Sequence, residues 1–186
     1  MRKIFALLFT AALCFSLIAC GSSPSASESP ETNPNAPSAQ TEDGSVEIPY
    51  SEPIVVLDNE YLTITATAKF EGELTGRGHC MGYRISIENK SDYFLLLNAN
   101  NCSLDGYMLN LQDGPFLAAD GISPQMKANT SLYFRPDRVE AVTLTSLDDL
   151  VNLHGTWQVS PFEVVNGTYA DVSFDTWFFG FDNVIP

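Results

Sequence analysis

The chain has 186 residues, of which 9 are basic and 23 acidic, so its formal net charge at pH 7 is −14. A surface with this excess of carboxylates repels phosphate backbones, which argues against DNA or RNA as a partner. The sequence contains no Gly-x-Ser-x-Gly, P-loop or dinucleotide-binding motif, so it offers no catalytic, cofactor-binding or metal-binding residues to assign.

Residues 1–19 have the features of a secretory signal peptide. Arg2 and Lys3 give a positive start, and residues 4–19 are almost wholly apolar up to Ala19. This run of sixteen residues is shorter than the roughly 20 that a helix needs to cross a bilayer. A short apolar run that ends in a small residue is typical of a cleaved signal. A helix that stays in the membrane is the alternative.

The end of the apolar run, Leu17-Ile18-Ala19-Cys20, resembles the lipobox of bacterial lipoproteins. The resemblance implies that Cys20 is lipidated and becomes the first residue of the mature chain. Two acyl chains on one residue anchor a protein stably, whereas one chain holds it only marginally. Loss of Arg2 and Lys3 would leave seven basic residues against 23 acidic ones, a net charge of −16. We therefore expect an extracytoplasmic protein anchored to the outer face of the cell membrane by its lipid.

The composition of residues 20–47 predicts a linker. Ser, Pro, Asn, Ala, Thr and Glu dominate this segment, and it contains no aromatic residue. Its apolar surface is too small to offset the entropy lost on ordering. We expect a disordered Ser/Pro-rich spacer that holds the following domain roughly tens of ångströms from the membrane.

Residues 48–186 are predicted to form one all-β domain, because hydrophobic residues recur with period two in several segments. The two clearest strands have buried faces made of Leu62, Ile64, Ala66, Ala68 and Phe70 in 61–71, and of Tyr83, Ile85 and Ile87 in 83–88. Shorter strands are expected at 131–136, 142–146, 156–162 and 169–179, with Pro161 closing the third. Residues 146–155 predict one short helix capped by Ser146. This pattern favours an antiparallel β-sandwich.

The strand at 82–88 and the segment 93–98 are predicted to form a β-hairpin. A register centred on Ser91 pairs Ile87 with Leu95 and places hydrophobic residues opposite one another. The same register places Cys80 opposite Cys102.

Cys80 and Cys102 are the two cysteines that remain if Cys14 leaves with the signal and Cys20 carries lipid. They are therefore candidate partners in a disulfide, which an exported protein permits. Two reduced thiols are the alternative.

Residues 83–109 resemble a segment of uncharacterised lipoproteins from Gram-positive gut bacteria. Asn89-Lys90-Ser91-Asp92 matches the turn of that segment, and Ser103-Leu104-Asp105-Gly106-Tyr107 matches a motif after its second strand. Residues 123–134 resemble the loop and strand that come next. The resemblance implies an immunoglobulin-like β-sandwich and a Gram-positive host. It supplies no catalytic residues, because no activity is established for the family.

The other candidates for chemistry favour structural roles. His79 and His154 lack metal-ligand spacing, so a zinc site or a Cys–His nucleophile pair is weakly supported. Asp113-Gly114 and Asp120-Gly121 lack the spacing of a calcium loop and favour two turns.

The aromatic run Trp177-Phe178-Phe179-Gly180-Phe181 places Trp177 and Phe179 on one strand face. If exposed, this face would form a binding surface for a partner or a glycan. A strand buried against the rest of the domain is the favoured alternative.

The sequence predicts a cell-surface protein whose β-sandwich binds a protein partner or a cell-wall polymer. An accessory solute-capture or sensing domain of an envelope complex is the alternative, and a surface hydrolase is the third hypothesis. We expect no cofactor.

Overall fold

The structure is a computed structural model, and it describes residues 39–40, 45–119, 121–165, 168–171 and 176–186. The chain divides into two units, Met1–Ala36 and Pro37–Pro186. The predicted signal peptide, Cys20 and most of the predicted linker lie outside the described residues. The part of the chain that is described contains no helix with the length and hydropathy needed to span a membrane.

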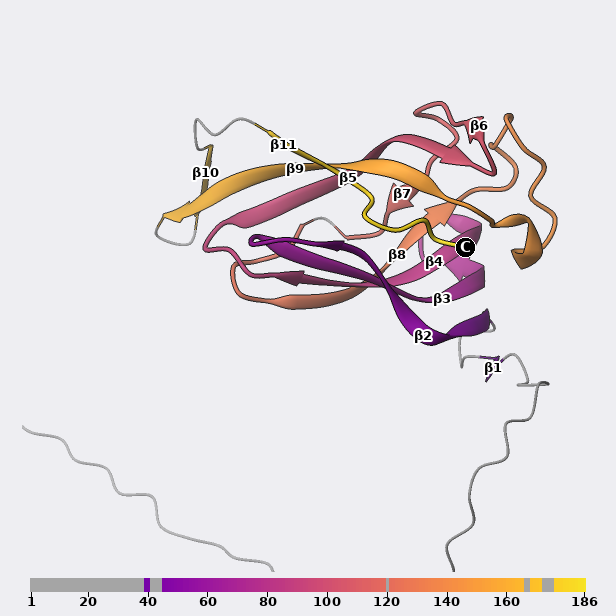
Figure 1. The fold of residues 1–186 in the computed structure, drawn as a ribbon, viewed down its shortest axis with the longest axis horizontal. Helices are drawn as coiled ribbons and strands as arrows, with labels where there is room; N and C mark the ends of the chain where they lie inside the picture. The colour runs from indigo at the N-terminus through magenta and orange to yellow at the C-terminus, as the bar shows by residue number, and fades with distance from the viewer. Residues whose placement is uncertain (1–38, 41–44, 120, 166–167, 172–175) are drawn as a thin grey trace, which may run out of the picture. The chain divides into compact units, whose positions relative to one another are not determined.

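The described residues form two antiparallel sheets (Figure 1). The first sheet has the order β1 (Ala39–Gln40), β2 (Val46–Asp58), β3 (Leu62–Leu74), β4 (Gly78–Asn89), β8 (Lys127–Phe134) and β7 (Phe116–Leu117). The second sheet has the order β10 (Thr168–Asp171), β9 (His154–Val165), β5 (Phe94–Leu104) and β6 (Tyr107–Met108), and β11 (Trp177–Gly180) also pairs with β9. The predicted all-β sandwich is confirmed.

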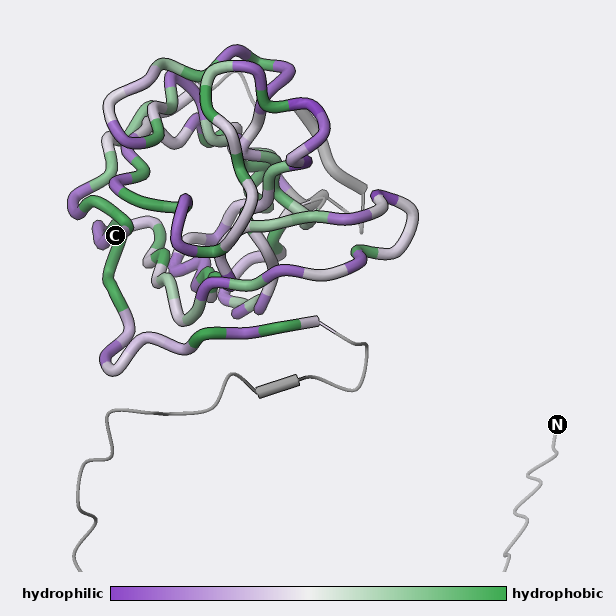
Figure 2. The backbone as a smooth tube through the Cα atoms, turned by 90° about the vertical axis from the view of Figure 1, so that its right-hand side faces the viewer, coloured by the Kyte–Doolittle hydropathy of each residue, from purple (hydrophilic) through white to green (hydrophobic). Residues whose placement is uncertain are grey.

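The core lies between the sheets and follows the alternation of the strands. All five predicted core residues of β3 are buried, from Leu62 to Phe70, and so are Tyr83, Ile85 and Ile87 of β4. The second sheet contributes Leu95 and Leu97 of β5 and Trp157 and Val159 of β9 to the same cluster. Each buried Leu, Ile, Val or Phe side chain of this core stabilises the fold by roughly 1.5–3 kcal/mol. Hydrophobic and hydrophilic stretches alternate along the tube in Figure 2.

The domain begins before the predicted boundary at residue 48, because β2 starts at Val46. Ser45 is almost fully buried, and a Cβ on Gly72 would lie only 2.5 Å from the Ser45 Cβ. Glu47 forms an ion pair with Arg84, whose guanidinium carbon lies 4.1 Å from the centre of the Phe70 ring. These contacts hold residues 45–47, which the sequence assigned to the linker, against the first sheet.

The predicted hairpin between residues 82–88 and 93–98 is wrong. β4 pairs with β3 and β8 in the first sheet, whereas β5 pairs with β9 and β6 in the second. The turn after Asn89 therefore carries the chain from one sheet to the other. Ile85 and Leu97 still lie in one core, because the two strands face each other across the sandwich. Alternation fixes which side chains point inward, and it does not distinguish strands paired edge to edge from strands stacked face to face.

Residues 142–146 form no strand, and the predicted helix at 146–155 is a single 3-10 turn, Leu147–Asp149. The segment instead packs on the core through a buried leucine at every third position: Leu144, Leu147, Leu150 and Leu153.

Pro161 does not close its strand, since β9 continues to Val165. β11 pairs with β9 up to Val159 and β10 pairs with it from Phe162 onward. Among the described residues, Pro161 thus faces the interval between these two strands. A missing N–H there breaks no ladder bond.

Candidate ligand-binding groove

The structure places the predicted aromatic surface largely on the inside. The rings of Trp177 and Phe179 are partly buried against the core, with centroids 4.3 and 6.4 Å from that of Tyr61. Phe178 points the other way and is 62% exposed. The exposed aromatic residue of β11 is therefore the one that the prediction left out.

Cys80 and Cys102 are both buried and free, so the candidate disulfide is not formed in this structure. They belong to different clusters, and each Sγ lies within hydrogen-bonding range of a nearby carbonyl, Gly78 O at 3.4 Å and Asn100 O at 3.5 Å. Burial raises the pKa of the Cys102 thiol to about 12. A thiol with this pKa stays protonated at neutral pH and is a poor nucleophile.

The other predicted candidates are dispersed. His79 Nε2 lies 3.3 Å from Glu71 Oε1, and exposed His154 is in register with Ser103 of β5. Within the described ranges, no three His, Cys, Asp or Glu side chains gather as they would around a metal. Asp113 is buried and stands in a turn, as expected. Asp120 lies outside the described residues.

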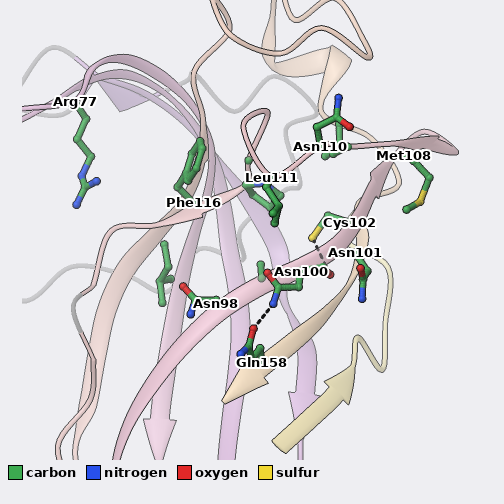
Figure 3. A pocket seen from close by; sticks show the side chains of 15 residues that line it. Arg77, Asn98, Asn100, Asn101, Cys102, Met108, Asn110, Leu111, Phe116 and Gln158 are labelled. Carbon is green, nitrogen blue, oxygen red and sulfur yellow. Dashed lines mark hydrogen bonds between the residues drawn. The ribbon is translucent and has the colours of Figure 1, made fainter. Parts of the chain in front are cut away.

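A groove with a volume of about 390 Å³ lies beside the edge of β5 (Figure 3). This volume is within the range of small-molecule sites. Five of its side chains are carboxamides, and we call it the amide groove: Asn98, Asn100, Asn101, Asn110 and Gln158. Leu111 and Phe116 lie on another side of the groove, and Arg77 lies at a distance from the amides, as Figure 3 shows.

The carboxamides are arranged to bind a ligand. Asn100 Nδ2 donates a hydrogen bond to Gln158 Oε1, which joins β5 to β9. The pair keeps Asn100 Oδ1 as a free acceptor and, as donors, the second N–H of Asn100 Nδ2 and both N–H groups of Gln158 Nε2. The side chains of Asn98, Asn101 and Asn110 make no hydrogen bond to another described residue.

The local sequence produces this arrangement through a β-bulge. β5 pairs Asn100 with Thr156 and Ser103 with His154, so two residues of β5 stand opposite Gly155 alone. Asn101 adopts the left-handed conformation, with φ of 49°, and its side chain is turned outward. A Cβ on Gly155 would lie 2.6 Å from Cys102 Sγ, so glycine is needed where the bulge packs. Bulges of this kind redirect side chains beside binding sites.

The loop at the far side of the groove is held by a buried carboxylate. Asp113, 2% exposed, accepts hydrogen bonds from the backbone N–H groups of Asn110 at 2.8 Å and Glu140 at 3.2 Å. These hydrogen bonds fix the loop beside the groove. Leu111, which is 82% exposed, and Met108, which is 66% exposed, lie around the groove. An exposed apolar rim next to unpaired polar groups is characteristic of a binding site.

The lining contains no carboxylate and no histidine among the described residues. Its ionisable groups are Arg77, whose Nη1 donates to the Tyr133 hydroxyl at 2.7 Å, and the protonated Cys102 thiol. The thiol, with its raised pKa, does not act as a general base at neutral pH. The groove can therefore bind a polar ligand by hydrogen bonds, and it lacks the paired carboxylates of a glycoside hydrolase.

The carboxamides of the groove were not predicted from the sequence, although three of them stand in an unusual sequence pattern. Asparagine is depleted in strands, yet the segment Asn98-Ala99-Asn100-Asn101 places three of them in one strand. Such a cost to strand stability suggests a function. The contributions of Asn110 and Gln158 have no comparable sequence signal, since each is brought in by the fold.

Comparisons with protein-family models, with characterised proteins and with solved structures give no match to this chain. The resemblances to bacterial lipoproteins and to an immunoglobulin-like domain remain predictions.

Proposed function

We propose that this is a lipid-anchored surface protein of a Gram-positive bacterium whose β-sandwich binds an uncharged glycan of the cell wall in the amide groove. Cys20 holds the chain to the outer face of the membrane, and the Ser/Pro-rich linker gives the domain its reach. The observation that supports glycan binding is that the described lining of the groove has five carboxamides and no carboxylate.

Carboxamides suit a neutral polyhydroxylated ligand. Each amide has two donors and one acceptor oxygen, and each sugar hydroxyl also donates and accepts, so the two can bond in either sense. Binding transfers no charge out of water, which keeps the desolvation cost small compared with that of an ionic contact. The chain's net charge of −14 opposes the approach of anionic wall polymers.

The test is a binding experiment with the purified protein. We expect it to bind oligomers of N-acetylglucosamine or of glucose by isothermal titration calorimetry, and not to bind an anionic teichoic acid. Asn98→Ala should weaken binding roughly tenfold by removing hydrogen bonds to the ligand. Asn129→Ala is the matched control, because Asn129 is an exposed asparagine of β8 in the other sheet.

Three outcomes would contradict the proposal. One is that neither sugar series binds. Another is that binding is unchanged in Asn98→Ala. The last is that a protein from the native envelope, rather than a glycan, is retained through the groove.

A further inference from the structure

Among the described residues, the outer face of the second sheet carries no charged side chain where β5, β11 and the first part of β9 lie side by side. β5, β6 and β11 contain no charged residue. The acidic residues in strands of this sheet are Glu163 of β9 and Asp171 of β10, and both lie in the part of the sheet where β10 pairs with the end of β9. The first sheet differs, since a single one of its strands, β3, already has three charged residues: Lys69, Glu71 and Glu73. The lack of charged side chains on this part of the second sheet is therefore unusual for a chain with 23 acidic residues.

Three side chains form a row across that face. Asn98 of β5 is in register with Gln158 of β9, and Gln158 is in register with Phe178 of β11. Trp157 and Val159, the neighbours of Gln158, are buried, so Gln158 points outward. Neighbouring strands lie about 4.8 Å apart, which places Phe178 about 10 Å from Asn98 along the row.

Phe178 stands open to solvent at the end of this row. Its side chain is 62% exposed, although the neighbouring Trp177 and Phe179 are packed inward. Gly180, two residues along β11, has no side chain, and a Cβ built there would meet no described atom within 4 Å. Thr156 and Ser160 of β9 add hydroxyl groups on the same face.

We infer that this row extends the amide groove, and that the ligand is a neutral polysaccharide chain lying across β5, β9 and β11 with one sugar stacked on Phe178. The inference rests on the proposed function and deepens it by assigning an extended chain as ligand. Sugar rings have an apolar C–H face that packs on an aromatic ring, while their hydroxyls bond to the amides. The absence of charge along the row matches a ligand without charge.

The experiment is a length series. Oligomers of N-acetylglucosamine and of glucose, from two to six sugars long, are titrated into the purified protein and its Phe178→Ala variant. Affinity should rise with length in the unmodified protein. Phe178→Ala should weaken binding of the longest oligomer roughly tenfold and leave the disaccharide unaffected. Phe178→Trp, which keeps an aromatic ring at this position, should retain the rise of affinity with length that Phe178→Ala loses.

Ile48→Ala is the matched control, because Ile48 is a 43% exposed apolar residue of β2 in the other sheet. Its variant should retain the full length dependence. If oligomers bind but neither length nor Phe178→Ala changes their affinity, the extended site is overturned and the groove proposal stands. If no oligomer of either series binds, the proposed function itself fails.

Discussion

At the scale of single residues, Asn89 organises the turn between the sheets. Its side chain is 1% exposed, and its Nδ2 donates to three backbone carbonyls, those of Tyr93, Ile122 and Ser123, at 2.7–3.0 Å. Its Oδ1 accepts from the backbone N–H of Ser91 at 2.9 Å and from the Ser91 hydroxyl at 2.7 Å. One buried carboxamide thus bonds to two segments, 91–93 and 122–123, next to the isolated bridge between Leu95 and Ile122.

We predict that Asn89→Asp destabilises the domain by about 3 kcal/mol, because the carboxylate has no N–H to donate and stands against the carbonyls that the amide now satisfies. The change is nearly isosteric, so packing is retained. Urea denaturation measures the free energy of unfolding, and Asn129→Asp is the control, because the Asn129 side chain on β8 is exposed. A loss within about 1 kcal/mol of that control would contradict this role.

At the scale of elements, the 3-10 turn Leu147–Asp149 depends on a carboxylate at its end. Asp149 Oδ2 accepts hydrogen bonds from the Thr145 backbone N–H at 2.7 Å, the Thr145 hydroxyl at 2.8 Å and the Ser146 backbone N–H at 2.9 Å. These bonds, led by that of the Thr145 N–H, lower the pKa of the Asp149 carboxyl below its ordinary value of 3.8. The turn is therefore stabilised by the ionised form.

The lowered pKa sets the direction of a pH dependence. The stabilisation is complete above pH 3.8 and is lost as the pH falls through the lower pKa of the folded state. Asp149→Asn should therefore lower the melting temperature at neutral pH, and its difference from the unmodified protein should shrink in acid. Asp148→Asn is the control, because Asp148 accepts none of these hydrogen bonds. The role of Asp149 would be refuted if the two melting temperatures were equal at neutral pH. It would also be refuted if their difference stayed constant down to strong acid.

At the scale of the whole molecule, the proposed lipid anchor would bring the proposed glycan-binding groove close to the cell wall. The acidic chain is poorly suited to lie on anionic lipid. A tether would let the uncharged face reach wall material while the rest of the surface is repelled.

The anchor has a direct test in cells. We predict that Cys20→Ser abolishes lipidation, so that the protein is either released from the membrane or retained with its signal uncleaved. Cell fractionation and intact mass spectrometry distinguish these outcomes from the lipidated form. Cys14→Ser is the matched control, because Cys14 lies within the expected signal and should be dispensable. An unchanged membrane fraction and mass for Cys20→Ser would disprove the lipid assignment.

The sequence by itself determined the local features of the fold, namely which side chains of a strand point inward. Period-two alternation correctly assigned the inward faces of β3 and β4, because successive side chains of a strand point to opposite sides wherever that strand lies. It also predicted the sandwich class. The same local information misplaced residues 142–146, where leucines pack on the core, and Pro161, where the positions of β10 and β11 along β9 let the strand continue.

Only the tertiary structure decided which strands are neighbours. The register of Ile87 with Leu95 looked consistent as a hairpin, yet the two residues belong to different sheets and share only the core, because β3 and β8 occupy both edges of β4. The groove and the row that extends it depend on the same long-range pairing, since Asn98, Gln158 and Phe178 come from three strands that are brought into register by β9. Strand pairing depends on contacts between distant segments, which alternation within one segment does not encode.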